Sequence, residues 1–315
     1  MKHSVSLAAI VLCLLFVNQA MAGSYALSDS IVGPHFFDAF SFQAIEDPTY
    51  GTVHYVDEST AKSKGLVSST KDRFTLRADD FTKLSAKGRG RDSLRVRSKK
   101  QYTTHVAVFD INHMPEGCGT WPAVWDKGDP WPYKGEADII EGVNSQGTNE
   151  VTLHTSRGCT MPSSRTMTGT ARDTDCQGGN GCGVFLKETS SFGPIFNSIG
   201  GGWYALERTR DFIKVWFWSR SDKSVPDDVK KGALSVETDR WGIPSANFLN
   251  THCDFTRYFG SNYIVINLDF CGEWAGNATL YTEAGCPGTC DEYVRNNPAA
   301  FSAAFFDFAS IRIYE

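Results

Sequence analysis

Residues 135–142 read GEADIIEG, so Glu136, Asp138 and Glu141 stand close together in an otherwise apolar, β-branched stretch. In a regular strand alternate side chains share a face, so Glu136 and Asp138 point one way and Glu141 points the other. One extra residue, a β-bulge within Asp138 to Glu141, would return Glu141 to the first face. The spacing therefore predicts a bulged strand with all three carboxylates on one surface.

Such a group of carboxylates has three interpretations. Mutual repulsion and partial burial separate the pKa values of neighbouring carboxyls, so that one stays protonated while another is ionised, and glycoside hydrolysis requires that division. A solvated acidic edge strand would not need the two isoleucines, Ile139 and Ile140. A calcium site would draw oxygen ligands from a flexible loop. The residue types favour a catalytic pair.

The bulk composition excludes some partners. The 315 residues contain 31 Lys and Arg against 36 Asp and Glu, a formal net charge of -5. This balance argues against nucleic acid or an anionic membrane as the main partner and leaves neutral substrates open. Aromatic residues make up 13% of the chain, with eight Trp. They suit either stacking on sugar faces or a β-rich core.

The first residues are typical of a signal peptide. Lys2 and His3 precede an apolar stretch over Val5–Val17, and Ala20-Met21-Ala22 supplies small residues for cleavage. The apolar stretch is too short to span a bilayer. We therefore expect residues 1–22 to be removed and residues 23–315 to form a soluble, secreted, extracellular protein.

The cysteines also fit an oxidising compartment. Of nine Cys, Cys13 falls in the signal segment, and the other eight form an even set. A disulfide framework is favoured, although its connectivity cannot be deduced from sequence. The segment Cys286-Pro-Gly-Thr-Cys290 could also suggest a metal site, but no His cluster lies beside it, which disfavours that interpretation. Asn277-Ala278-Thr279 fits an N-glycosylation acceptor.

Short strand-like segments recur between turns, and neither a repeat nor a linker divides residues 23–315. The clearest strands are Thr103–Asp110, Phe212–Trp218, Tyr263–Phe270 and Ala309–Tyr314. The strongest helix candidate runs from Asp291 to Phe306, interrupted by Pro298. The Gly-rich segment 178–183 is interpreted as a disulfide-tied loop. The pattern predicts one all-β sandwich domain.

The motif E-x-D-x-x-E resembles the signature of the bulged, laminarinase-type branch of family 16 glycoside hydrolases. The resemblance is greatest to secreted fungal endo-1,3(4)-β-glucanases of the basidiomycete laminarinase kind, and it covers nearly all of residues 23–315. The other matching segments, in order, are FFD (36–38), DPT (47–49), GCGTWPA (117–123), WP (131–132), EGVN (141–144), TLHT (152–155), GGWYA (201–205) and FCGEWAG (270–276).

This resemblance implies a β-jelly-roll sandwich of two antiparallel sheets with a concave substrate cleft. By position, Glu136 is implied to be the nucleophile and Glu141 the general acid/base, with Asp138 hydrogen-bonded to the nucleophile. It further implies retention of anomeric configuration, for which the two Glu carboxyls lie about 5–5.5 Å apart. The implied partner is a β-glucan polysaccharide cut by a monomer without a cofactor or metal.

The resemblance also implies substrate-binding residues. His154 matches a cleft histidine beside the catalytic subsite, although a lone His in a strand can equally be structural. The implied sugar contacts are Trp121, Trp125 and Trp274, with Arg95 less secure because Arg97 shares its face. Trp216 and Trp218 are interpreted as core residues. Two residues depart from the family's usual pattern. Ala137 stands where a larger aliphatic residue is usual, and Glu273 stands where an Asp is usual.

Two rival functions remain at this stage. A non-catalytic glucan-binding protein on the same fold would lose the catalytic carboxylates, and all three are present here. A glucan transglycosylase would pass the covalent glycosyl group to a sugar instead of water. The outcome depends on acceptor binding beyond the cut, which the sequence does not distinguish.

Overall fold

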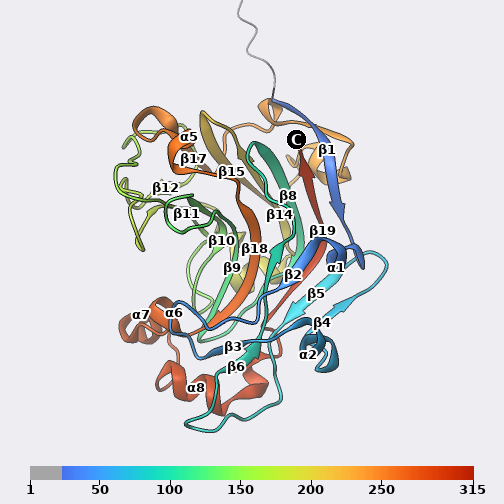
Figure 1. The fold of residues 1–315 in the computed structure, drawn as a ribbon, viewed down its shortest axis with the longest axis vertical. Coiled ribbons are helices and arrows are strands. Elements are labelled where there is room, and N and C mark those ends of the chain that lie inside the picture. Colours follow the sequence, from blue (N-terminus) through green and yellow to red (C-terminus); the bar gives the residue numbers. More distant parts are fainter. Residues whose placement is uncertain (1–22) are drawn as a thin grey trace, which may run out of the picture.

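The structure is a computed structural model that describes residues 23–315, and the expected signal segment 1–22 lies outside the described residues. Two large antiparallel sheets face each other (Figure 1). The outer sheet has the order β16-β1-β19-β8-β14-β15-β17, and β5 extends it from β19 with β4 beside it. Its strands are β16 (Ser235–Glu237), β1 (Ser24–Ile31), β19 (Phe305–Tyr314), β8 (His105–His113), β14 (Gly202–Arg208), β15 (Phe212–Ser219), β17 (Ala246–Leu249), β5 (Phe74–Arg77) and β4 (Val67–Ser69).

The second sheet carries the GEADIIEG segment as an interior strand. Its order is β12-β13-β11-β10-β9-β18-β7-β2. The strands are β12 (Thr170–Ala171), β13 (Cys182–Phe185), β11 (Glu150–His154), β10 (Glu136–Glu141), β9 (Thr120–Lys127), β18 (Tyr263–Phe270), β7 (Arg95–Ser98) and β2 (Phe40–Phe42). A short parallel pair, β3 (Val53–Tyr55) and β6 (Arg91–Ser93), forms a separate two-stranded sheet beside β18.

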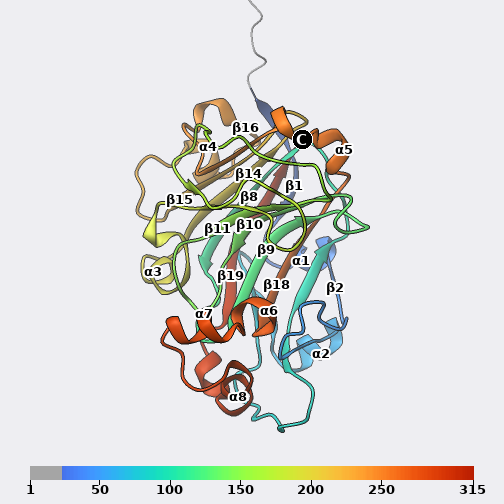
Figure 2. The ribbon, with the colours of Figure 1, turned by 90° about the vertical axis from the view of Figure 1, so that its left-hand side faces the viewer.

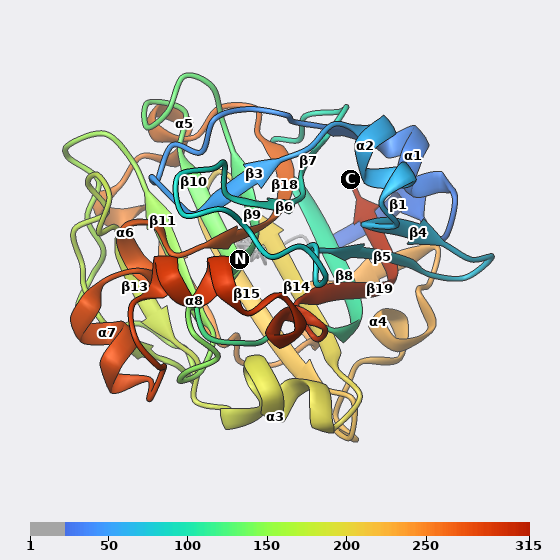
Figure 3. The ribbon, with the colours of Figure 1, turned by 90° about the horizontal axis from the view of Figure 1, so that it is seen from below.

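The helices are short and lie outside the sandwich. They are α1 (His35–Ala39), α2 (Glu58–Ser63), α3 (Gly193–Ser198), α4 (Asp227–Lys231), α5 (Phe255–Tyr258), α6 (Gly272–Ala275), α7 (Ala278–Glu283) and α8 (Cys290–Asn296). Figures 2 and 3 show α6, α7 and α8 gathered at one end of the molecule. Within residues 23–315, no helix is long and apolar enough to cross a membrane.

The main core fills the space between the sheets. Alternation along paired strands puts Ala137 and Leu153 into this core, while their neighbours Glu136 and His154 face the other way. A second cluster covers the outer sheet, where Trp216 and Trp218 pack edge-on against Trp241 with ring centroids 5.3 and 5.7 Å apart. The prediction that Trp216 and Trp218 belong to the core is confirmed.

The eight cysteines within residues 23–315 form four disulfides. The bonds are Cys118–Cys286, Cys159–Cys253, Cys176–Cys182 and Cys271–Cys290. The predicted framework is therefore confirmed, and the two cysteines of the CPGTC segment belong to different bonds. The Cys176–Cys182 bond closes the Gly-rich loop that the sequence indicated.

The strand predictions hold, with shifted ends, whereas the helix prediction was too long. Tyr263–Phe270 is a strand with the predicted bounds, and the last strand starts at Phe305 rather than Ala309. The helix ends at Asn296, two residues before Pro298, because a proline disfavours helical backbone at the residue before it. The two phenylalanines at 305 and 306 belong to β19, where they pair with β5.

Candidate active site

Strand β10 contains the predicted bulge. It pairs regularly with β9 from Glu136 to Asp138, and the register then shifts between Asp138 and Ile140. The shift buries Ile139 and Ile140 together in the core and returns Glu141 to the face of Glu136 and Asp138. Because β10 lies between β9 and β11, the acidic edge-strand interpretation is excluded.

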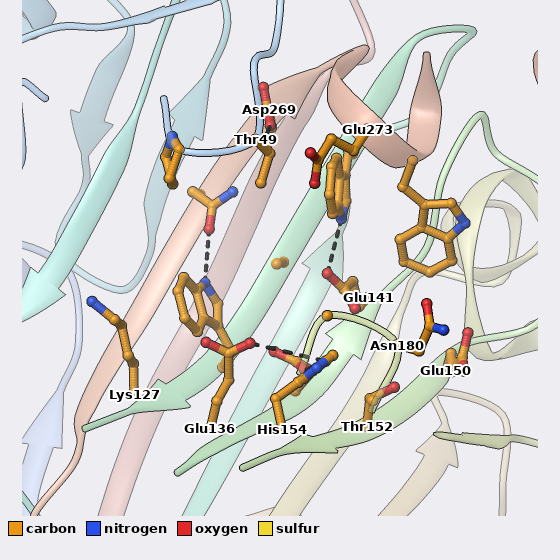
Figure 4. A pocket seen from close by; sticks show the side chains of 18 of the residues that line it. Thr49, Lys127, Glu136, Glu141, Glu150, Thr152, His154, Asn180, Asp269 and Glu273 are labelled. Carbon is orange, nitrogen blue, oxygen red and sulfur yellow. Dashed lines mark hydrogen bonds and ion pairs between the residues drawn. The ribbon is translucent and has the colours of Figure 1, made fainter. Parts of the chain in front are cut away.

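The three carboxylates line a cleft of about 900 Å³ on this sheet. All eight residues singled out from the sequence line it, namely Arg95, Trp121, Trp125, Glu136, Asp138, Glu141, His154 and Trp274. Figure 4 shows Glu136 and Glu141 extending into it with His154 beside Glu136, while Thr49 and Asp269 lie together on another side. The cleft crosses six strands, from β7 to β13.

His154 stands opposite Glu136 in the β10–β11 ladder. Its Nδ1 lies 2.7 Å from the carbonyl oxygen of Gly178, in the loop closed by the Cys176–Cys182 disulfide. A carbonyl only accepts, so Nδ1 carries a proton and Nε2 faces the acids. Nε2 lies 3.1 Å from Asp138 Oδ2 and 3.9 Å from Glu136 Oε1.

Asp138 has His154 as a polar neighbour besides the expected Glu136. Within residues 23–315 its Oδ2 is buried without a well-aligned hydrogen bond, and Nε2 of His154 approaches this oxygen. The three residues Glu136, Asp138 and His154 offer ligand atoms within 4.8 Å of one another. This cluster could hold a cation, and it is equally suited to exchanging protons among its members.

Glu141 contacts the indole ring of Trp121, which packs against a second indole ring. Trp121 Nε1 donates a hydrogen bond to Glu141 Oε1 over 2.9 Å. Trp274 meets Trp121 edge-on, with ring centroids 5.6 Å apart at 88°. Glu141 is half-buried in this position.

Arg95 and Trp125 form a stacked pair elsewhere in the cleft. The Arg95 guanidinium lies 4.9 Å from the Trp125 ring centroid, and Trp125 Nε1 donates to Asn267 Oδ1 over 2.7 Å. Arg97 instead stacks on Tyr263 and lies 3.5 Å from Asp129. The structure thus separates the two arginines, and only Arg95 of the two lines the cleft.

Burial dominates the electrostatics of the carboxylates. It raises the pKa of Glu136 to about 8, with the charge of Asp138 adding to the rise and His154 opposing it. The pKa of Glu141 rises to about 8 for the same reasons, opposed by His154 and the Trp121 N–H. Burial, followed by the charges of Glu150 and Asp126, holds the pKa of Asp138 well above its usual range. The cleft therefore retains protons on its acids near neutral pH.

Several cleft residues were missed by the sequence interpretation. Asn267 and Asp269 are polar positions on one face of an otherwise apolar strand, a signal that alternation could have revealed. Asp269 shares the hydroxyl of Thr49 with Asp47, and burial beside Asp47 raises the pKa of Asp269 to about 7. On the other side of β10 the missed residues are Glu150, Thr152, Arg172, Asn180 and Phe185.

An open sandwich cleft lined by paired carboxylates and indole rings is the arrangement of a glycoside hydrolase. A family model described as the XgeA-like catalytic GH16 domain matches residues 40–314. The chain therefore belongs to family 16 of the glycoside hydrolases, as the sequence resemblance implied.

Individual relatives agree with this assignment. The chain is 42% identical over 304 residues to a probable endo-1,3(4)-β-glucanase of Aspergillus clavatus, covering 93% of this chain and 46% of that protein. It thus spans less than half the length of that curated relative.

Solved structures with the same fold include laminarinase 16A from Phanerochaete chrysosporium, in a complex with 6-O-glucosyl-laminaritriose in its donor and acceptor sites. That structure has 53% identity and a TM-score of 0.92, covering 93% of this chain and 100% of the other. An elongating family 16 β-1,3-glucosyltransferase has 38% identity and a TM-score of 0.86, covering 92% and 100%. The predicted jelly-roll fold is confirmed.

Proposed function

We propose that residues 23–315 form a secreted, endo-acting, retaining β-glucanase that hydrolyses β-1,3 and mixed β-1,3/1,4 glucans such as laminarin. The observation that carries this proposal is the bulge of β10, which brings Glu136 and Glu141 into one cleft. The names of the relatives support the substrate class. The four disulfides and the signal-like segment support secretion.

In the first step, the ionised Glu136 attacks the anomeric carbon while Glu141 protonates the departing glycosidic oxygen. The bond from the anomeric carbon to the leaving sugar breaks, and a covalent glycosyl ester forms on Glu136. In the second step, Glu141 takes a proton from water, the water oxygen attacks the anomeric carbon, and the ester bond to Glu136 breaks. Two inversions give net retention.

Asp138 and His154 influence the protonation of the two glutamates. With Nδ1 of His154 donating to Gly178, a neutral His154 presents Nε2 as an acceptor to a protonated Asp138. A neutral Asp138 no longer repels negative charge on either glutamate, which allows one of them, Glu136 in this proposal, to ionise while Glu141 keeps its proton. This is the protonation state that the first step requires, and coupled groups of this kind titrate together.

Asp138→Asn should stabilise the protein at neutral pH. The folded pKa values of Glu136 and Glu141, about 8, exceed the ordinary value of 4.5. The folded state therefore binds protons more tightly, so this contribution is full below about pH 4.5 and is lost as pH rises toward 8. Burial likewise keeps Asp138 protonated in the folded state, whereas it would ionise in the unfolded chain, and this costs stability above its ordinary pKa of 3.8. An Asn does not titrate, so the substitution should add about 1–3 kcal/mol near pH 8. Thermal unfolding between pH 5 and 8 measures the effect.

The control for this variant is Asp227→Asn, at an exposed carboxylate of α4. It should leave the pH dependence of unfolding unchanged. A wild-type stability that rises from pH 5 to 8, or no gain for Asp138→Asn, would show that the cleft acids do not hold their protons as described.

The substrate is tested by digesting linear β-1,3, mixed β-1,3/1,4 and β-1,6-branched glucans with the purified protein. We expect oligosaccharides of several lengths from β-1,3 and mixed-linkage chains at early times, as internal cutting produces. Release of glucose alone would exclude the endo mode, and no product from any glucan would exclude the activity.

A second candidate function is transfer of the glycosyl group to another glucan. The similarity to a β-1,3-glucosyltransferase favours keeping this alternative, because that protein shares the fold at 38% identity. Products longer than the starting laminari-oligosaccharide would indicate transfer, and shorter products alone would indicate hydrolysis.

A further inference from the structure

Beside the bulge of β10, the side chain of Asn149 forms hydrogen bonds that a neighbouring strand would otherwise form. The ladder between β10 and β11 runs from Glu136–His154 to Asp138–Thr152, whereas pairing with β9 continues to Glu141–Ala123. Past Asp138, Asn149 supplies the hydrogen bonds on the β11 side. Its Nδ2 donates to the carbonyl of Ile139 over 2.8 Å, and its Oδ1 accepts from the backbone N–H of Glu141 over 2.9 Å.

The orientation of this carboxamide follows from its partners. A carbonyl needs a donor and an N–H needs an acceptor, so exchanging the amide oxygen and nitrogen would lose both bonds. Ile139 and Glu141 are separated by one residue, and their main-chain groups reach the same side of an extended strand. One carboxamide therefore bridges the register shift and satisfies two buried backbone groups that a regular ladder would otherwise pair.

Asn149 is itself held by the surrounding structure. It has no exposed surface. Its backbone N–H donates to Ser191 Oγ over 3.0 Å, and its carbonyl accepts from the N–H of Leu186 over 2.9 Å. The hydroxyl of Tyr204, on β14 of the outer sheet, in turn donates to the Ser191 carbonyl. The carboxamide is thus anchored to both sheets.

We propose that Asn149 is a positioning residue that fixes the bulge of β10 and thereby holds the Glu141 side chain in the cleft beside Glu136. In a regular ladder, strict alternation would send Glu141 to the core face. Beyond Asp138 the β10–β11 ladder no longer pairs the backbone of the bulge, and the carboxamide bonds to Ile139 and Glu141 in its place. This inference rests on the proposed role of Glu141 as acid/base.

The test compares two substrates that differ in their need for an acid. A laminari-oligosaccharide has a poor leaving group that needs protonation, whereas a 2,4-dinitrophenyl β-laminaribioside does not. Asn149→Ala should lower kcat/KM for the oligosaccharide by about 100-fold, the scale of general acid catalysis, and for the aryl substrate by only about threefold. A loss of equal size on both substrates, or no loss, would overturn the inference.

Asn197→Ala is the matched control. The carboxamide of Asn197 also bridges backbone groups, because it accepts from the N–H of Met114 and donates to its carbonyl, both over 2.9 Å. Met114 follows strand β8 of the outer sheet, and neither Met114 nor Asn197 lines the cleft. Loss of the Asn197 carboxamide should lower thermal stability without changing the ratio of the two kcat/KM values. A changed ratio in this variant would show that general destabilisation produces the effect, which overturns the inference.

Asn149→Asp gives a rescue that does not depend on the alanine variant folding. A protonated carboxyl matches the carboxamide, since its O–H donates to the Ile139 carbonyl and its C=O accepts from the Glu141 N–H. We expect its oligosaccharide activity to approach that of the wild type at low pH and to fall as the introduced carboxyl ionises. A pH profile parallel to that of the wild type would overturn the inference. A wild type inactive on both substrates would instead refute the proposed function.

Discussion

Replacing Glu136 with alanine should lower kcat for hydrolysis of laminarin by about 10⁴-fold or more, because the covalent intermediate can no longer form. Binding should survive, since the indole rings of Trp121 and Trp125 remain in the cleft. Initial rates and a direct binding measurement on laminari-oligosaccharides, with Asp227→Asn as the surface control, measure the two effects separately. Near-normal activity in Glu136→Ala would contradict the assigned mechanism.

Added azide should restore turnover to Glu136→Ala with an activated aryl β-glucoside of the β-1,3 series. The small anion enters the space left by the carboxylate, attacks the anomeric carbon and displaces the aryl group. One inversion then gives an α-glycosyl azide, which nuclear magnetic resonance identifies. A β-azide would place the missing carboxylate in the acid/base role instead.

Replacing Glu141 with alanine should lower kcat/KM on laminarin by about 10²–10⁴-fold, the usual contribution of general acid–base catalysis. The first step should be nearly normal with a 2,4-dinitrophenyl leaving group, because that group departs without a proton. Hydrolysis of the intermediate then becomes slow, so a burst of dinitrophenol should precede a slow steady state. Stopped-flow absorbance measures the burst.

Azide distinguishes the two glutamates in this variant as well. In Glu141→Ala it should attack the ester on Glu136 and give a β-glycosyl azide after two inversions. An equal loss of activity on laminarin and on the aryl substrate, with no burst, would mean that Glu141 is not the acid/base.

The strand pattern and the bulge could be predicted because each rests on local spacing. Alternating residues identified strands such as Tyr263–Phe270, and the interval from Glu136 to Glu141 required one extra residue if the carboxylates were to share a face. Strand ends were less predictable. Phe305 and Phe306 continue β19 because they pair with distant residues of β5.

The supporting contacts could not be predicted, because they join residues distant in sequence. Asn149 carries no periodic signal, and its role appears only where its carboxamide meets the bulge. The partner of His154 is a backbone carbonyl in the Cys176–Cys182 loop, which residue type does not reveal. The approach of His154 to Asp138 could not be predicted either, because it joins two strands whose pairing the spacing of residues does not reveal. The division of the chain into residues 1–22 and 23–315 stays a prediction.

The most direct test of the account is to trap the covalent intermediate. A 2-deoxy-2-fluoro-β-laminaribiosyl donor with a 2,4-dinitrophenyl leaving group should glycosylate the enzyme rapidly, with loss of dinitrophenolate, and the glycosyl-enzyme should hydrolyse slowly. Peptide mapping by mass spectrometry should then place the fluorosugar on Glu136. A label on Glu141 or Asp138, or hydrolysis of the natural substrate with inverted configuration, would contradict the assignment of Glu136 as nucleophile.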